Sequence, residues 1–298
     1  MVFAVVGWVT FFSMLISTAF FIVIERKMLG MVQLRQGPNK PSVKGLLVFL
    51  ADGVKLFTKG LLIPHSANKK LFVMAPVFMF SLSFGVWMIM PNPFPPEYYK
   101  YSVLYFLALS ASNVFAVVLV GWSSNSSYAM LGAMRAIAQS ISYEVGMFTV
   151  FMCPLLLIFG FEYQRMQDNP VVAGVYCSNS LILWFISVLA ETNRAPFDFV
   201  EGESELVAGF HVEVGGGLFA LIALAEYGAI IGMSVFTVVL FISGVNIFLF
   251  VLSVLMLSYL FVLVRAALPR YRYDMLMDFC WTKLLPLSMC NFLFIMVW

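Results

Sequence analysis

The sequence predicts an all-α polytopic membrane protein with about eight transmembrane helices. Of its 298 residues, 62% are hydrophobic and only 11% are charged, whereas a soluble domain carries roughly 25% charged residues. Several apolar runs reach or approach the ~20 residues that an α-helix needs to cross a bilayer. The short segments of alternating polarity that are typical of an outer-membrane β-barrel do not occur. These observations exclude a water-soluble protein and favour a helical membrane protein.

The apolar runs, together with the charged residues and the Pro and Gly positions between them, place the spans. We expect them at residues 2–24, 70–90, 101–121, 133–160, 175–191, 214–235, 237–264 and 278–298. No charged segment precedes the first run and no small-residue cleavage site follows it, which predicts a retained helix and not a signal peptide. The chain, 1–298, is expected to form a single integral membrane domain.

The distribution of positive charge predicts the orientation of the chain. With eight spans, the loops 25–69, 122–132, 192–213 and 265–277 lie on one side of the membrane. Only Lys100 and Arg165 fall on the opposite side, so fifteen of the 17 Lys and Arg residues lie at or near these four loops. Lys and Arg collect on the cytoplasmic or matrix side of membrane proteins. We therefore expect the four loops to face the matrix.

The first of these loops is predicted to contain a helix. Over residues 42–59, a helical step of 100° per residue places Lys44, Asp52, Lys55 and Lys59 within an arc of about 80°, and apolar side chains cover most of the remaining surface. This pattern is typical of an amphipathic helix that lies on the membrane surface or against another subunit. A lipid-facing role and a site-lining role both remain open.

An unusual concentration of acidic residues lies between Ala190 and Glu213. This stretch holds six of the chain's 15 acids and one cation, Arg194. Carboxylates this close repel one another, so some must be protonated, paired with cations from elsewhere or bound to a positive group. The stretch is therefore the first place to look for chemistry. Its acids are Glu191, Asp198, Glu201, Glu203, Glu205 and Glu213.

Two further acids are expected inside the membrane. Glu144 follows Arg135 by nine residues, or ~13.5 Å along a helix, so the two cannot pair. Glu226 lies a similar way into the sixth span, beside Tyr227. A charged carboxylate at such a depth costs ~2.5 kcal/mol or more, which favours a functional role. A neutral Glu144 that is hydrogen-bonded to a neighbouring backbone is the structural alternative.

These acids form a candidate proton path. The sequence gives little support for a metal site or a cysteine-based site. Glu191, Glu213, Glu144 and Glu226 would run from the charged loops into the membrane interior, as in proton relays. No metal site is expected, because the acids lack an EF-hand pattern and His65 and His211 have no ligand-spaced partners. The four Cys residues are scattered and fit a packing role. The nearby Arg residues could be counter-ions or could simply reflect topology.

Several motifs resemble those of the quinone-chamber membrane subunit of respiratory complex I, the proton-pumping NADH:quinone oxidoreductase. The runs Glu-Thr-Asn-Arg-Ala-Pro-Phe-Asp (191–198) and Glu-Gly-Glu-Ser-Glu-Leu (201–206) carry the resemblance most specifically. The sequence departs from the family pattern at Gln36, Gly60, 215–218 and Met275. Further matching segments occur in family order at residues 25–30, 34–35, 37–39, 121–126, 132–136, 141–145, 225–227 and 269–274.

The resemblance implies a subunit that has no catalytic power alone and forms much of a chamber for ubiquinone, the substrate. It implies no cofactor on this chain; FMN and iron–sulfur clusters would belong to peripheral-arm partner subunits. Small membrane subunits, antiporter-like subunits and lipid would be the other partners, with no nucleic acid. It implies that loop 192–213 is a mobile link. The quinone-binding residues would be Glu25, Arg26, Asp52, Arg135, Asp198, Glu201, Arg270 and Arg272, and the proton path would include Glu144, Glu191, Glu201, Glu213, Glu226 and Tyr227.

Two points of function and location stay open at the level of sequence. A cation/proton antiporter or a hydrogenase membrane anchor is the rival class, although a carrier would more often show inverted repeats and broken helices. The compact loops and the abundance of Phe and Met, 31 and 19 residues, favour a multi-pass protein of the mitochondrial inner membrane over one of the bacterial plasma membrane.

Overall fold

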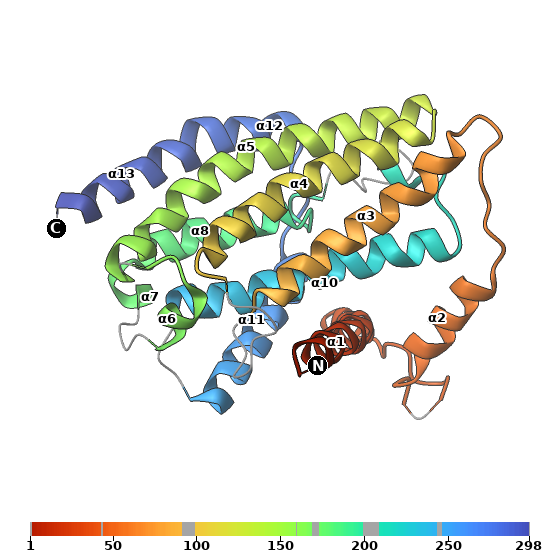
Figure 1. The fold of residues 1–298 in the computed structure, drawn as a ribbon, viewed down its shortest axis with the longest axis horizontal. Helices are drawn as coiled ribbons and strands as arrows, with labels where there is room; N and C mark the ends of the chain where they lie inside the picture. The colour runs from red at the N-terminus through yellow and green to blue at the C-terminus, as the bar shows by residue number, and fades with distance from the viewer. Residues whose placement is uncertain are drawn as a thin grey trace.

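The computed structural model describes residues 2–42, 44–90, 99–158, 160–168, 173–198, 209–242 and 246–297. Within these ranges every regular element is a helix (Figure 1). Seven helical segments there are long and apolar enough to cross a membrane. The prediction of an all-α polytopic membrane protein is therefore confirmed. The long helices are α1 (Val2–Val32), α3 (Lys69–Met88), α4 (Ser102–Ser123), α5 (Ser127–Ile158), α10 (Gly217–Phe241) and α11 (Ile247–Ala267).

Shorter elements complete the described chain. The seventh long segment runs from α12 through a π-helix into α13 without interruption. The short helices either join the long ones or lie beside their ends (Figure 1). They are α2 (Val48–Thr58), α6 (Tyr163–Asp168), α7 (Ala173–Tyr176), α8 (Ser178–Glu191), η1 (Gly209–His211), α12 (Tyr273–Asp278), the π-helix η2 (Phe279–Leu284) and α13 (Leu285–Val297).

The expected fifth span, 175–191, is shorter than a full transmembrane helix. It corresponds to α8, which has 14 residues and is therefore about 21 Å long, less than the ~30 Å of a hydrocarbon core. Its two ends nevertheless meet different parts of the bundle. Gly174, just before α8, packs against the backbone of Phe241, and Pro196, just after it, accepts a hydrogen bond from the Tyr271 amide at 3.1 Å. This segment crosses the bundle as expected, but with a shorter helix.

Several predicted boundaries are wrong. The helix of the first span continues to Val32 and does not end at residue 24, and the last span begins at Tyr273 and not at residue 278. The break between the sixth and seventh spans was expected near Ser234 to Thr237, but α10 continues to Phe241. The hydroxyls of Ser234 and Thr237 donate to carbonyls of the preceding turn, at 2.7 and 3.1 Å, so these polar residues need no loop. The fourth span begins at Ser127 and not at residue 133, which shortens the expected loop 122–132.

Loop contacts show that alternate ends of the helices gather together. The Asn68 amide donates to the Ser123 carbonyl at 3.0 Å, which joins the segment before α3 to the end of α4. At the other end of α4, the Val103 amide donates to the Phe161 carbonyl at 3.3 Å. The chain therefore alternates between two ends of the bundle, as the charge asymmetry required. That the end with most of the cations faces the matrix stays a prediction.

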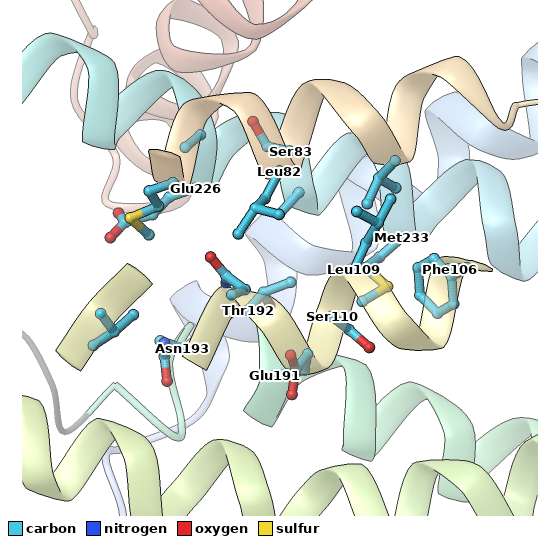
Figure 2. A pocket seen from close by; sticks show the side chains of 16 residues that line it. Leu82, Ser83, Phe106, Leu109, Ser110, Glu191, Thr192, Asn193, Glu226 and Met233 are labelled. Carbon is cyan, nitrogen blue, oxygen red and sulfur yellow. The ribbon is translucent and has the colours of Figure 1, made fainter. Parts of the chain in front are cut away.

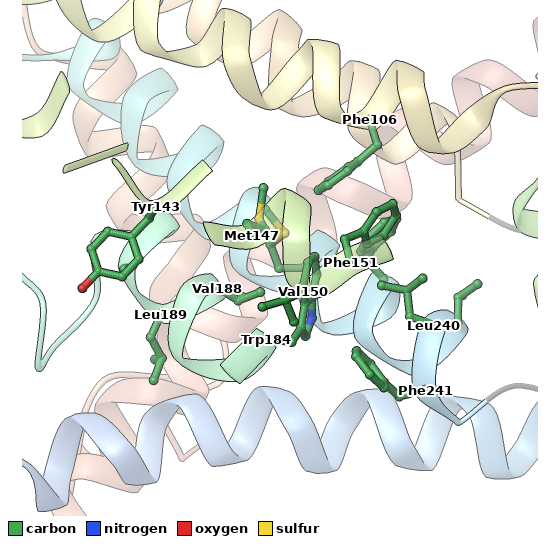
Figure 3. Packing of buried hydrophobic residues seen from close by; sticks show 14 of the residues in the cluster. Phe106, Tyr143, Met147, Val150, Phe151, Trp184, Val188, Leu189, Leu240 and Phe241 are labelled. Carbon is green, nitrogen blue, oxygen red and sulfur yellow. The ribbon is translucent and has the colours of Figure 1, made fainter. Parts of the chain in front are cut away.

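A cluster of aromatic rings holds the centre of the bundle together. The Phe236 ring of α10 lies 4.2 Å from that of Phe106 on α4 and 5.3 Å from that of Phe151 on α5. Trp184 of α8 lies 5.6 Å from the same ring. Figure 3 shows Phe106, Phe151 and Trp184 converging from these helices. Such pairs contribute about 0.5–1.5 kcal/mol each beyond their burial, and they fix the position of α8 relative to α4, α5 and α10.

The amphipathic helix predicted in the first loop is present as α2. It begins at Val48, later than expected, and the Arg26 guanidinium of α1 pairs with Asp52 on it at 2.9 Å. Its apolar residues Val54 and Phe57 are 62% and 66% exposed. The described residues do not cover this face, and both a lipid surface and another subunit fit it.

Candidate proton-path cavity and quinone site

A cavity of about 70 Å³ lies between α3, α4, α10 and the end of α8 (Figure 2). Most of its wall is apolar, but polar groups enter it from all four of these elements. The lining residues are Met79, Leu82, Ser83, Val86, Phe106, Leu109, Ser110, Asn113, Val117, Glu191, Thr192, Asn193, Ala225, Glu226, Ala229 and Met233.

Two acids of the predicted proton path line this cavity. Glu191 comes from the end of α8 and Glu226 from α10, so residues 35 positions apart in the sequence reach one space (Figure 2). Ser110, Asn113 and Thr192 add groups that can hydrogen-bond to water. A buried water requires about 10–15 Å³ and two to four polar partners. The cavity therefore has the size and the polarity to hold several waters between the two carboxyl groups.

Glu144, on α5, lies near Glu191, the last residue of α8. Their carboxyl groups are close enough to interact electrostatically. One oxygen of each, Oε1 of Glu144 and Oε2 of Glu191, is buried without a hydrogen-bond partner among the described residues. When two acids interact in this way, the proton occupancy of one depends on that of the other. Glu144 and Glu191, both on the predicted proton path, therefore lie near each other, and Glu191 lines the cavity.

On the other side of the cavity, Glu226 pairs with a histidine. Its Oε1 lies 3.2 Å from Nε2 of His211, whose side chain is only 7% exposed. This pair was not predicted, since the two residues are 15 positions apart and the turn that joins η1 to α10 brings them together. Glu213 lies in that turn, half-buried. It does not line the cavity, and it forms no ion pair within the described chain.

A second group of charges lies next to Glu226 along α10. Glu25 of α1 is 5% exposed and forms an ion pair with Arg265 of α11. Tyr227 interacts with both Glu25 and Arg194, and the Arg194 guanidinium carbon lies 4.3 Å from the centre of its ring. The sequence indicated Glu25 and Tyr227 but assigned no contact to Arg194 or Arg265. The pairing depends on helix packing, which composition does not reveal.

The start of the acidic stretch is fixed to the rest of the bundle. Asp198 is buried and lies 3.4 Å from the Arg270 guanidinium. Nε2 of Gln139, on α5, donates to the carbonyls of Ala190 and Phe197 at 2.9 and 3.0 Å. The two predicted quinone residues Asp198 and Arg270 therefore do meet. Gln139, which was not predicted, holds both ends of the segment that joins Glu191 to Asp198.

The remaining quinone candidates are more dispersed. Arg26 and Asp52 pair with each other, and about half of each side chain is exposed. Arg272 pairs with Asp274 at 3.2 Å on the surface, and the Arg135 guanidinium lies 6.0 Å from the ring centre of Tyr273. None of these residues lines the cavity of Figure 2. Glu201 lies outside the described residues.

Comparison with known proteins shows the family to which the chain belongs. A family model described as NADH dehydrogenase matches residues 5–296. The chain belongs to the NADH dehydrogenase family. It is 43% identical over 286 residues to NADH-ubiquinone oxidoreductase chain 1 of Aedes aegypti, which covers 95% of this chain and 91% of the relative. The protein of that name from Lampetra fluviatilis is 43% identical over 289 residues, covering 93% and 90%. That of Heterololigo bleekeri is 44% identical over 290 residues, covering 95% and 93%.

In this member of the NADH dehydrogenase family, Glu191 and Glu226 share the cavity wall with hydroxyl and amide groups. No group of three or more His, Cys, Asp or Glu within the described ranges could hold a metal ion. Hydroxyl, amide and carboxyl groups of this kind, with waters between them, can pass protons along hydrogen bonds.

Proposed function

We propose that this chain is the membrane subunit of NADH:ubiquinone oxidoreductase that couples ubiquinone reduction to proton translocation. Ubiquinone is the substrate, and electrons arrive from FMN and iron–sulfur clusters on peripheral-arm partner subunits. Neighbouring small membrane subunits and antiporter-like subunits receive the protons. The complex lies in the mitochondrial inner membrane, in keeping with relatives from animals.

The observation that carries this proposal is the cavity shared by Glu191 and Glu226. Each end of it adjoins residues that the quinone assignment requires. Glu226 precedes Tyr227, which contacts Glu25 and Arg194. Glu191 is joined by a short segment to Asp198, which contacts Arg270. The proposed proton path and the proposed quinone site therefore share one piece of backbone.

In this proposal, a change of charge at the quinone site couples ubiquinone reduction to proton movement. Reduction of a quinone consumes protons, which changes the charge beside the Asp198–Arg270 pair. A change in the field at Asp198 acts on the segment 190–198, whose ends are held by Gln139. Glu191 lies at the start of that segment and interacts with Glu144. A shift in proton occupancy at Glu191 is then passed to Glu144 on one side and across the cavity to Glu226 on the other.

Substitution of Asp198 tests the quinone part of this proposal. In the assembled complex, Asp198→Asn removes the negative partner of Arg270, and we expect ubiquinone reductase activity to fall at least tenfold. Oxidation of NADH by a hydrophilic artificial acceptor should remain normal. An inhibitor-sensitive ubiquinone reductase rate equal to that of the wild type would remove Asp198 from the site. Asp278→Asn, an exposed acid on α12, is the matched control.

Photolabelling separates the proposal from its rival. A quinone analogue should label the complex in the segments 25–59 and 190–198. A cation/proton antiporter or a hydrogenase anchor would share the acidic path but would not require a quinone site. Absence of label from both segments would therefore count against the quinone assignment.

A further inference from the structure

His211 is buried beside two aromatic rings and a cavity-lining acid. Its ring centre lies 3.6 Å from that of Phe210 and 6.1 Å from that of Phe219, which meets it edge-on. Its Nε2 points to Glu226, at 3.2 Å from Oε1. Only 7% of the side chain is exposed. The imidazole therefore contacts a cavity-lining acid from within the protein and is largely shielded from bulk solvent.

The packing of η1 on α5 sets the position of this histidine. A Cβ atom added at Gly132 would lie 2.8 Å from the backbone of both Gly209 and Phe210. The two backbones thus touch at a place where even one methyl group does not fit. Because η1 rests directly on a transmembrane helix, the distance between His211 and Glu226 is defined by the bundle.

The helices α4, α5 and α10 carry few charged residues. Glu226 is the one charged residue of α10, and α4 carries none. The charged residues of α5 are Arg135, which lies near Tyr273, and Glu144, which interacts with Glu191 across the cavity wall. Glu213 follows His211 by two residues, and Glu25 and Arg194 interact with Tyr227, the neighbour of Glu226. Glu226 contacts the His211 ring directly, at 3.2 Å.

We propose that His211 and Glu226 share one transferable proton, which makes His211 a proton-holding residue of the path. The proton passes from Nε2 of the imidazolium to Oε1 of the carboxylate and leaves a neutral imidazole beside a neutral carboxyl. The reverse step restores the ion pair. Histidine suits this role, because it is the side chain that changes charge near neutral pH. The inference rests on the proposed proton path and adds a residue at the end of the acidic stretch to it.

The backbone gives this pair a link to the quinone side. His211 is the last residue of η1, which lies near the C-terminal end of the acidic stretch, whereas Glu226 is fixed on α10. A displacement of η1 would lengthen the contact between Nε2 and Oε1 and interrupt the proton exchange. His211 is thus a positioning residue for the charge of Glu226 as well as a carrier.

The pH dependence of the assembled oxidoreductase carrying His211→Asn tests the inference. Asparagine preserves polarity and approximate size but cannot carry the proton. Because the variant loses the group that holds the proton beside Glu226, the pH profile of ubiquinone reductase activity should shift by about one unit. His65→Asn, an exposed histidine in the loop before α3, should leave the profile unchanged.

A second variant keeps the test decisive if His211→Asn does not assemble. Glu226→Asp shortens the carboxylate side chain, lengthens the contact and should shift the profile in the same direction. Wild-type profiles for every assembled variant of this pair would overturn the inference. If Glu191→Gln still abolished pumping in that case, the proton path would stand without His211. If Glu191→Gln pumped normally as well, the proposed function itself would fail.

Discussion

At the scale of single residues, the ion pair between Glu25 and Arg265 shows how a buried charge is accommodated. The Glu25 carboxylate is almost fully enclosed, and 30% of the Arg265 side chain is exposed. A buried carboxylate is tolerated only if it is paired and hydrogen-bonded. Arg265 and the neighbouring Tyr227 supply these partners. The exposed pair of Arg26 and Asp52 contrasts with it, since solvent screens an exposed pair.

Breaking the buried pair should therefore lower the stability of the complex more than breaking the exposed pair. Arg265→Gln leaves the Glu25 charge buried alone, which costs about 3 kcal/mol, the lower end of the range for buried pairs because Arg265 is partly exposed. Arg26→Gln should cost about 0–1 kcal/mol. The thermal stability of the assembled complex measures both. The double variant Glu25→Gln/Arg265→Gln should recover most of the loss; equal stability of the two single Arg variants would contradict this account.

Residue identity alone indicated many of the candidates but few of their partners. Glu144, Glu191 and Glu226 were recognisable because acids are expensive in apolar runs. Gln139 and His211 carried no such signal, because a single polar residue in a helix and an isolated histidine are common. Their roles depend on a contact with the segment 190–198 and with α10, and such contacts appear only when the helices are packed.

At the scale of elements, the contact between α5 and η1 positions the end of the acidic stretch. The length of the apolar runs predicted the long helices well, since each has close to the ~20 apolar residues that a transmembrane helix needs. It did not predict where α10 ends, because Ser234 and Thr237 are satisfied within their own helix. Nor did it predict η1, a single turn whose place depends on the absence of a side chain at Gly132.

Gly132→Ala tests the importance of this contact. The added methyl group would lie 2.8 Å from the η1 backbone, so η1 must move and carry His211 away from Glu226. We expect ubiquinone reductase activity to fall several-fold and its profile to shift as in His211→Asn. Gly53→Ala on α2, where an added Cβ meets nothing within 4 Å, is the matched control and should be silent. Equal activity of both variants would show that the contact has no role.

At the scale of the whole molecule, most Lys and Arg residues lie toward one end of the bundle, whereas Glu144, Glu191 and Glu226 lie between its two ends. The short α8 makes this arrangement possible. Because α8 ends early, Glu191 enters the cavity between α3, α4 and α10 and the following residues turn toward Asp198 and Arg270. The segment 191–198 would therefore join the proposed proton path to the Asp198–Arg270 pair.

The most direct test of this coupling is the number of protons pumped per NADH oxidised by the complex with Glu191→Gln, reconstituted in vesicles. Removal of the acid that both lines the cavity and interacts with Glu144 should lower the number of protons pumped per NADH oxidised by ubiquinone at least tenfold. Oxidation of NADH by the artificial acceptor should remain intact, as it should in the Asp278→Asn control. A wild-type ratio of protons to NADH in the Glu191→Gln complex would contradict the account.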